Sequence, residues 1–220
     1  MSSRRKATWP LRPLRRGPDR QAAIAQYQAR APTYDLELAP FEQIRRLAIE
    51  RLALQPGDTV LDVGCGTGLS LERLQAEVGA KGHVVGIEQS PAMISQAGHR
   101  NRAQGLRNVK LICAPAEEAQ IEGRADAALF HFTHDVLRRP EALDRVISHL
   151  KPGGRLVACG LKWTSPWAVP INLFVWGAAL RSVSSMRGLE RPWSLLGERI
   201  DLDVEELWLG AVFLASGVRK

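Results

Sequence analysis

The sequence predicts an α/β fold in which helices cover both faces of a mostly parallel sheet. One observation is that strand-like and helix-like segments alternate along the chain from residue 58 to residue 161. Another is that the first strand ends in a turn with three glycines, VLDVGCGTG. The 220 residues, 45% hydrophobic and 24% charged, also suit one soluble globular domain of this class.

Each predicted strand is an apolar run, and each predicted helix repeats its apolar residues every three or four positions. The expected strands are 59–63, 83–87, 109–113, 125–130 and 155–159. The expected helices are 69–78, 91–103 and 141–150. Residues 151–154, which include two glycines and a proline, are expected to form a turn before the fifth strand. Right-handed crossovers should connect the parallel strands.

Two regions lie outside this alternation. Residues 21–30 and 41–54 are expected to form helices before it. Residues 162–200 are rich in tryptophan and proline, and they are expected to cover the substrate. Their apolar stretch, 168–180, is shorter than the ~20 residues that span a bilayer, so a buried or lid-forming helix is expected there instead of a membrane span. The tryptophans of residues 162–200 either form an apolar pocket for an acceptor or pack as a cap or a dimer face: Trp163, Trp167, Trp176 and Trp193. Residues 204–216 are expected to form a last strand or a hairpin, interrupted at Gly210.

The net charge of +7 is concentrated at the start of the chain. Residues 1–20 hold seven basic residues against Asp19, a net charge of +6. We predict that this segment is a disordered basic arm and that residues 21–220 form the folded domain. The arm is either a solvated tail or a contact to anionic lipid or nucleic acid. No apolar run of ~7–15 residues follows the charges, so the arm is not expected to be a secretory signal. A nearly neutral body disfavours nucleic acid as a partner.

The three cysteines have no spacing typical of a metal site. Cys65, Cys113 and Cys159 each lie in or beside an apolar run. An odd number of buried, reduced cysteines is typical of a cytoplasmic protein, and we expect neither a disulfide nor a bound metal.

The glycine turn differs from a phosphate-binding turn. Gly64, Gly66 and Gly68 are spaced one residue closer than the dinucleotide fingerprint Gly-x-Gly-x-x-Gly, and no Gly-Lys-Ser/Thr follows. Asp62, two residues before the first glycine, would repel a pyrophosphate at short range. Its carboxylate suits an ammonium or sulfonium group instead.

A second carboxylate ends the second predicted strand. Glu88 in VVGIEQS is placed to accept both hydroxyls of an adenosine ribose, and it disfavours a 2′-phosphate. The two carboxylates together indicate an adenosine with a cationic, amino-acid-like tail. S-adenosylmethionine has these parts.

Four segments in succession carry a family resemblance. VLDVGCGTG, VVGIEQSPAMISQA, ADAALFHFTHDVL and LKPGGRLV resemble the motifs of class I S-adenosylmethionine-dependent methyltransferases over residues 58–161. The pattern Tyr27-x-x-x-Ala31-x-x-Tyr34-Asp35 and the ending LGAVFLASGVRK are similar to small-molecule members, the ubiquinone and menaquinone methyltransferases and some bacterial phospholipid N-methyltransferases. The resemblance implies a Rossmann-like, seven-stranded sheet with an antiparallel last strand, N-terminal helices and a helical cap after the fifth strand.

The resemblance also implies a site for S-adenosylmethionine, with S-adenosylhomocysteine as its product. Asp62, Gly64 and Gly66 would lie along the methionine part, Glu88 at the ribose and Gln89 beside the adenine. The expected cofactor-binding residues are Tyr27, Tyr34, Asp62, Gly64, Cys65, Gly66, Gly68, Glu88, Gln89, Met93, Ala116, Glu117 and Phe130. The two tyrosines either close over the cofactor and line the substrate site or pack the N-terminal helix on the sheet.

The sequence departs from the family pattern after the third strand. Family members often carry an acidic residue near the adenine amino group at this point. In this chain the matching stretch is APAE, residues 114–117, and Pro115 stands at the acidic position. The Ala116 backbone and Glu117 would then make the adenine contact in its place. After the fourth strand, FHFTHD lacks the Asn/Asp-Pro-Pro-Tyr element of members that methylate DNA or protein glutamine. This argues against those substrates.

Methyl transfer from a sulfonium is an in-line displacement that needs alignment first. It needs a base only where the nucleophile must lose a proton. His131 and His134 follow the fourth strand and are the candidate catalytic residues, although His134 also fits a family histidine with a structural role. Asp135 is expected to cap the following helix.

The predicted function is methyl transfer from S-adenosylmethionine to a small apolar or aromatic, quinone- or natural-product-like acceptor. One alternative is a phospholipid headgroup N-methyltransferase at a membrane surface, where the arm and residues 168–180 contact lipid. Another is a cofactor-binding protein without methyl transfer. A nucleic-acid methyltransferase is disfavoured, and the sequence predicts no oligomeric state.

Overall fold

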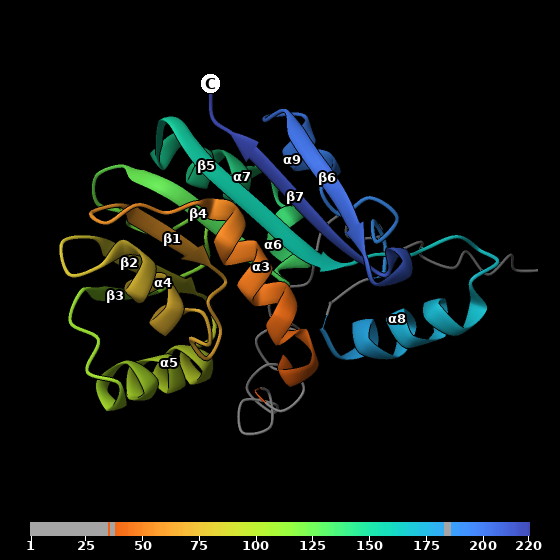
Figure 1. The fold of residues 1–220 in the computed structure, drawn as a ribbon, viewed down its shortest axis with the longest axis horizontal. Helices are drawn as coiled ribbons and strands as arrows, with labels where there is room; N and C mark the ends of the chain where they lie inside the picture. The colour runs from red at the N-terminus through yellow and green to blue at the C-terminus, as the bar shows by residue number, and fades with distance from the viewer. Residues whose placement is uncertain (1–34, 36–37, 183–185) are drawn as a thin grey trace, which may run out of the picture.

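The computed structural model describes residues 35, 38–182 and 186–220. They form a seven-stranded sheet in the order β3-β2-β1-β4-β5-β7-β6 (Figure 1). The strands are β1 (Thr59–Val63), β2 (His83–Glu88), β3 (Val109–Cys113), β4 (Ala125–His131), β5 (Leu150–Leu161), β6 (Leu202–Leu207) and β7 (Val212–Val218). Strands β1 to β5 are parallel, whereas β7 runs antiparallel to β5 and to β6. The predicted mixed sheet with an antiparallel last strand is confirmed.

Helices cover both faces, as predicted. On one face lie the 3₁₀ helix η1 (Ala39–Phe41) and helices α3 (Glu42–Leu52), α4 (Leu71–Val78), α5 (Pro91–Ala103) and α8 (Val169–Ser182). On the other lie α6 (His134–Leu137), α7 (Pro140–His149) and α9 (Ser194–Gly197). The 3₁₀ helix η2 (Trp208–Gly210) joins β6 to β7.

Alternation along the central strands determines which face each side chain meets. On β1, Val60 belongs to the core under α3 and α4, and Leu61 belongs to the core under α7. Asp62 therefore points to the same face as Val60, toward α3. The order of the strands reverses between β1 and β4, which is where α/β sheets bind ligands, beyond the carboxyl ends of the strands.

One predicted element, the turn before the fifth strand, is wrong. Residues 151–154 are not a turn but the start of β5, because Gly153 donates to the Arg219 carbonyl and Arg219 donates to the Gly154 carbonyl. Gly153 has a φ of +78°, a left-handed conformation that glycine adopts without steric cost. The final segment is a hairpin, which is one of the two expected alternatives, and Gly210 lies at its interruption with a φ of +86°.

The cysteines are free, but only two are buried. Cys65 and Cys159 lie in the interior, whereas Cys113 is exposed. The prediction of three buried cysteines is wrong because β3 lies at the edge of the sheet, where a strand has a neighbour on one side only. The expected basic arm, the helix at 21–30, Tyr27 and Tyr34 lie outside the described residues.

Candidate functional site

A cleft with about 710 Å³ of empty space opens beyond the carboxyl ends of β1, β2 and β4. Most of its lining comes from four segments: the turn after β1, the end of β2, the loop after β3 and the segment from β4 into α6; Met93 of α5 and Arg139 complete it. Of the predicted cofactor residues, the cleft collects Gly64, Gly66, Glu88, Gln89, Met93, Ala116 and Glu117. Both candidate histidines, His131 and His134, line it as well.

The glycine turn is held close to its neighbours. The N–H groups of Gly64 and Cys65 donate to the Ile87 carbonyl at 2.7 and 3.0 Å, which fixes the turn against β2. Gly64 has a φ of +74°, and a Cβ there would lie 2.4 Å from Thr133 Cγ2. Only glycine fits where the turn meets the β4–α6 loop this closely.

Glu88 connects the turn to the start of α5. Its Oε2 accepts the Gly66 N–H at 3.2 Å, and its Oε1 accepts the Ser90 N–H at 2.8 Å. Burial raises the pKa of Glu88, and hydrogen bonds from the backbone N–H groups of Ser90, Gly66 and Gln89 partly oppose the shift. Each carboxylate oxygen keeps a lone pair for a further donor in the cleft. This arrangement suits two hydroxyls of a ligand.

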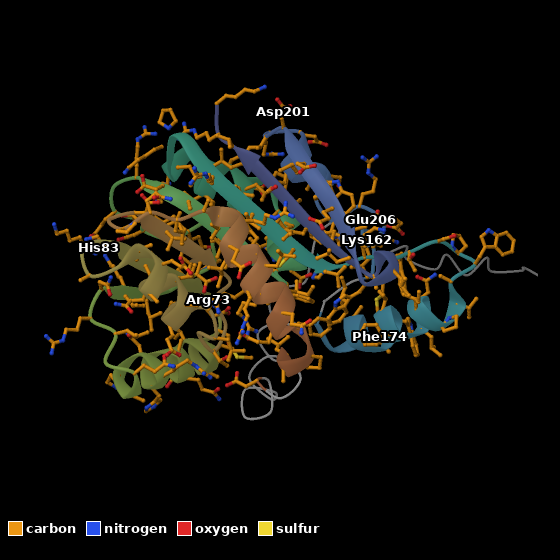
Figure 2. The ribbon with its side chains drawn as sticks, viewed as in Figure 1. Arg73, His83, Lys162, Phe174, Asp201 and Glu206 are labelled. Carbon is orange, nitrogen blue, oxygen red and sulfur yellow. The ribbon has the colours of Figure 1, made fainter. Side chains whose placement is uncertain are left out.

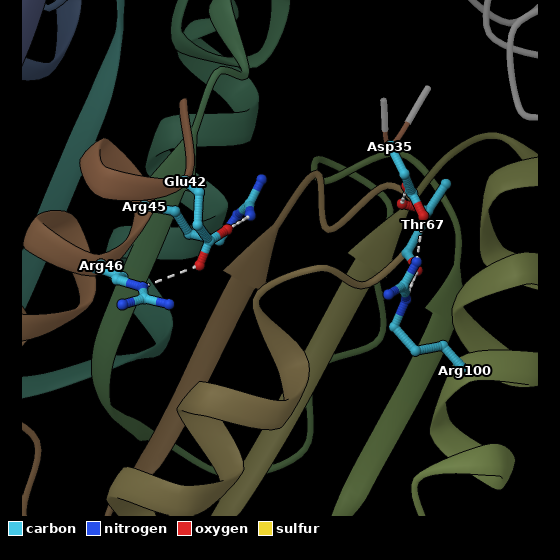
Figure 3. A network of polar contacts seen from close by, with 6 residues as sticks. All are labelled: Asp35, Glu42, Arg45, Arg46, Thr67 and Arg100. Carbon is cyan, nitrogen blue, oxygen red and sulfur yellow. Dashed lines mark hydrogen bonds and ion pairs between the residues drawn. The ribbon is translucent and has the colours of Figure 1, made fainter. Parts of the chain in front are cut away.

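A smaller cavity, with about 300 Å³ of empty space, lies on the α3 side of the same turn. Its lining includes Asp62 and Cys65 from the predicted site and Arg45 from α3. Among the described residues, no hydrogen-bond partner meets Asp62 Oδ2 or the Nε and Nη2 atoms of Arg45, although all three atoms are buried. Arg45 contacts Glu42 through its remaining nitrogen, Nη1 (Figure 3). The cavity thus presents a buried carboxylate oxygen and buried guanidinium N–H groups together.

The charges in this cavity are strongly desolvated. Burial raises the pKa of Asp62 to about 7; the Arg45 guanidinium opposes that shift and the Glu88 carboxylate adds to it. A buried carboxyl with an unused oxygen is costly to keep charged unless a cation joins it. The electrostatics therefore favour a ligand that brings an ammonium group to Asp62 and a carboxylate to Arg45.

His131 lines both the cleft and the small cavity. Its Nε2 is buried and meets no hydrogen-bond partner among the residues that the structure describes. Burial, followed by the Arg45 charge, holds the pKa of His131 well below its usual value, so the ring is neutral at pH 7. The neutral ring keeps the lone pair that a proton acceptor needs, although burial and the Arg45 charge make it a weak base in the ligand-free protein.

His134 occupies a different environment. It is buried, and its Nε2 donates to the Leu161 carbonyl at 2.8 Å. Its ring lies edge-on to Phe213, with centroids 6.3 Å apart, and a Cβ on Gly160 would lie 2.6 Å from its Cε1. These contacts attach the β4–α6 loop to β5 and β7. Asp135 does not cap α6, because the helix begins at His134 and places Asp135 inside its first turn.

Two predicted cofactor residues, Phe130 and Gly68, line neither the cleft nor the small cavity. Phe130 is fully buried in the core under α7. Gly68 has a φ of +81°, and a Cβ there would meet Leu71 at 2.7 Å and Ala97 at 3.1 Å. Gly68 therefore allows α5 to pack against the turn.

A polar network ties the glycine turn to the segment before η1 (Figure 3). Thr67 donates its hydroxyl to Asp35 Oδ1 at 2.6 Å. Arg100 of α5 pairs with the other oxygen of Asp35 and donates from Nε to the Thr67 carbonyl at 3.1 Å. The Asp35 carboxylate thus holds the turn and α5 together.

Aromatic rings gather beside the site, but they are not the expected tryptophans. Phe132, a residue lining the cleft, lies 4.7 Å from Phe41 between ring centroids. Phe41 in turn lies 5.2 Å from Trp208 and 6.4 Å from Phe174 of α8. We call these four residues the aromatic cluster.

The four tryptophans named from the sequence do not form one pocket. Trp163 packs on the core under α3, and Trp193 packs on Phe213 from the other face of the sheet. Trp167 and Trp176 are exposed.

Sequence reasoning missed Arg45 and the Asp35–Thr67–Arg100 network. Arg45 had a detectable signal, because it lies on the stripe of α3 that is otherwise apolar, with Ile44, Ala48 and Leu52. A charged residue on a core-facing stripe needs a partner. The network had no such signal, since its members are 32 to 65 residues apart.

The chain resembles known proteins in three comparisons: with a family model, with curated proteins and with solved structures. A family model described as a methyltransferase domain matches residues 54–170. The chain is 33% identical over 138 residues to the aklanonic acid methyltransferase DauC of Streptomyces sp. (strain C5), covering 61% of this chain and 60% of that protein. It is 30% identical over 131 residues to the ubiquinone/menaquinone biosynthesis C-methyltransferase UbiE of Vibrio cholerae, covering 58% and 50%.

Solved structures share the fold at lower identity. A SAM dependent methyltransferase from Aquifex aeolicus superposes with a TM-score of 0.62 at 22% identity, over 90% of this chain and 98% of that one. The N-methyltransferase NodS from Bradyrhizobium japonicum WM9, in complex with S-adenosyl-L-homocysteine, gives 0.64 at 18% identity, over 90% and 97%.

The curated relatives are longer than the matched region, since the chain spans about half to three-fifths of DauC and UbiE. The predicted resemblance to S-adenosylmethionine-dependent methyltransferases of the small-molecule type is confirmed by these matches. Because the family model covers more than half of the chain, the protein belongs to the methyltransferase-domain family.

Proposed function

We propose that this protein moves a methyl group from S-adenosylmethionine to a small apolar or aromatic acceptor. The observation that carries the proposal is the small cavity, where Asp62 and Arg45 offer opposite charges beside the glycine turn. Its two charges match the ammonium and carboxylate of an amino acid. When bound, S-adenosylmethionine supplies a sulfonium-activated methyl group.

The residues of the cleft suit the rest of that cofactor. Glu88 would accept the ribose hydroxyls, while the Gly66 and Ser90 N–H groups hold its carboxylate in place. Gln89, Met93 and Ala116 line the part of the cleft suited to adenine. The Glu117 carboxylate already forms an ion pair with Arg139 at 3.1 Å. We therefore expect it to line the cleft without accepting a hydrogen bond from the cofactor.

We assign the proton-accepting role to His131 ahead of His134. His131 lines both cavities, and its buried Nε2 has no partner among the described residues. His134 also has a buried ring nitrogen without a partner there, Nδ1, but it lines the cleft alone and uses its Nε2 to hold the Leu161 carbonyl. His134 thus orients the β4–α6 loop, and His131 would take a proton from an acceptor hydroxyl or acidic carbon as the methyl group arrives.

The acceptor class follows from the aromatic cluster. Phe132 follows His131 directly and contacts Phe41, so the wall beside the proposed base is aromatic. Such a wall suits a flat, apolar ring. DauC and UbiE, by their names, act in aklanonic acid and quinone chemistry, which agrees with this class.

The test is acceptor-dependent turnover. Purified protein, S-adenosylmethionine and a panel of hydroxynaphthoquinols and aromatic polyketide acids should yield S-adenosylhomocysteine and a methylated product, both detected by mass spectrometry. Turnover with ethanolamine phospholipid vesicles instead would favour the headgroup alternative. Tight cofactor binding with no turnover on any acceptor would favour a cofactor-binding protein that transfers no methyl group.

A further inference from the structure

Helix α8 has apolar residues on both its inner and its outer side. Its inner side is buried at Val175 and Ala179. Its outer side exposes four apolar residues spaced three or four apart: Val169, Leu173, Trp176 and Leu180. Trp167, just before the helix, is 91% exposed, and we call these five exposed residues the α8 patch. Surface helices normally carry polar residues on the outer side, so the α8 patch indicates an interaction surface.

Nothing polar interrupts this surface. Between residues 169 and 180 Asn172 is the one polar side chain, and it is used internally. It accepts the Thr164 N–H and donates to the Ser165 carbonyl, both at 3.0 Å. The 14-residue helix is shorter than the ~20 residues that cross a bilayer, and the described part of the chain holds no helix long and apolar enough to do so. An apolar partner would therefore meet α8 along its side.

The charge of the chain is distributed to suit an anionic partner. Residues 1–20 carry a net charge of +6, while the other 200 residues carry about +1. Three arginines also follow the α8 patch closely, Arg181, Arg187 and Arg191, against the single acid Glu190. Tryptophan favours the headgroup level of a bilayer, and basic residues near the surface favour anionic lipid. A second copy of the chain would bring the same positive charge to the contact, which opposes pairing.

We propose that α8 lies in the surface of an anionic lipid bilayer, with the α8 patch against the acyl chains. Phe174 of α8 belongs to the aromatic cluster, so docking would bring the aromatic wall of the site beside the lipid (Figure 2). The proposal goes beyond methyl transfer, because docking requires neither cofactor nor turnover.

The test is sedimentation of the full chain with vesicles. Phosphatidylcholine vesicles containing phosphatidylglycerol should bind the protein, and high salt should weaken binding because it screens surface charge. The double variant Leu173→Gln/Trp176→Gln should bind at least about tenfold more weakly. The matched control is Val218→Gln, which removes an equally exposed apolar residue at the end of β7 and should change binding by less than about twofold.

A second variant separates charge from apolar contact. Arg4→Gln/Arg5→Gln/Lys6→Gln should lower the preference for phosphatidylglycerol and leave binding to neutral vesicles unchanged. Calorimetric binding of S-adenosylhomocysteine to every variant reports the cofactor site independently, so a failure of docking and a failure of the proposed function are distinguishable. Absence of sedimentation, equal binding by the α8 and Val218 variants, or an α8-dependent dimer without lipid binding would each overturn the proposal.

Discussion

Arg45 of α3 and Asp62 of β1 face the same small cavity with opposite charges, and each keeps buried polar atoms unused by the described part of the chain. The Arg45 charge lowers the pKa of Asp62, but burial outweighs it. The pair is therefore incompletely neutralised without a ligand. A zwitterionic amino-acid group would supply one partner for each residue.

Glu88→Gln should weaken binding of every ligand that carries the ribose. Loss of a charged acceptor for a hydroxyl costs about 1.5–3 kcal/mol, which is about 10- to 100-fold in affinity. Calorimetry with S-adenosylhomocysteine and with 5′-methylthioadenosine should show the same loss for both. Glu122→Gln, at an exposed carboxylate paired with Lys110, is the control and should bind like the wild type. Unchanged affinity in Glu88→Gln would refute the ribose assignment.

Asp62→Asn should stabilise the ligand-free protein at neutral pH. The folded pKa of Asp62, about 7, lies above its unfolded value of 3.8, so ionisation penalises the folded state as pH rises from about 4 to about 7. The variant should be more stable than the wild type at pH 7.5 by a few kcal/mol at most, because a pKa difference of one is worth about 1.4 kcal/mol. The two proteins should match near pH 4. Urea unfolding at both pH values measures this.

Asp201→Asn provides a control of opposite sign. Lys220 lowers the pKa of this exposed carboxyl, so the charged form is favoured in the folded state above the unfolded pKa. Its replacement should slightly reduce stability at neutral pH and have no effect at low pH. A pH-independent difference between wild type and Asp62→Asn would contradict the assignment of a destabilising, buried carboxylate.

Substitution of His131 should mainly reduce activity, whereas substitution of His134 should mainly reduce stability. His131→Gln should reduce kcat by about 10²- to 10⁴-fold, the usual contribution of a general base, and should cost less stability than His134→Gln, because His131 Nε2 has no hydrogen bond to lose among the described residues. His134→Gln should lose about 1–3 kcal/mol of stability, because the Leu161 carbonyl loses its donor in the interior. Steady-state kinetics and urea unfolding of both variants decide this, and a reversed pattern would exchange the two roles.

Thr67→Val should loosen the glycine turn. The substitution keeps the shape of the side chain but leaves Asp35 Oδ1 without the hydroxyl that donates to it, at a cost of about 1 kcal/mol. Thr67→Ser keeps the hydroxyl and serves as the control. Hydrogen exchange of the amides from residue 64 to residue 70 should accelerate in the valine variant and not in the serine variant. Equal exchange in both would show that the network does not hold the turn.

Local signals in the sequence predicted the core of the fold well. The bounds of β1, α5 and β3 agree with the residues expected, since β-branched runs and a Ser90–Pro91 helix start are determined within a few positions. The start of β5 was missed because it depends on pairing with Arg219, at the far end of the chain. The exposure of Cys113 depends on the order of the strands rather than on its neighbours in sequence.

The candidate site also combines residues that a local motif predicts with residues that only the tertiary fold brings together. The glycine turn and Glu88 could be predicted because the turn is one short continuous motif and Glu88 ends the next strand along the chain. Arg45 could not be assigned from the motif, because only the tertiary fold brings it to the cavity that Asp62 lines. The aromatic cluster likewise joins η1, the β4–α6 loop, α8 and η2, four segments that only the tertiary fold brings together.

The most direct test of the small cavity compares two ligands on two arginine variants by calorimetry. S-adenosylhomocysteine carries the amino-acid group, and 5′-methylthioadenosine has the same adenosine without it. Arg45→Gln should weaken S-adenosylhomocysteine binding by about tenfold or more and leave 5′-methylthioadenosine binding unchanged. Arg46→Gln, on the solvent side of the same helix, should change neither. Equal effects of Arg45→Gln on both ligands, or no effect on either, would contradict a small cavity that binds the amino-acid end of the methyl donor.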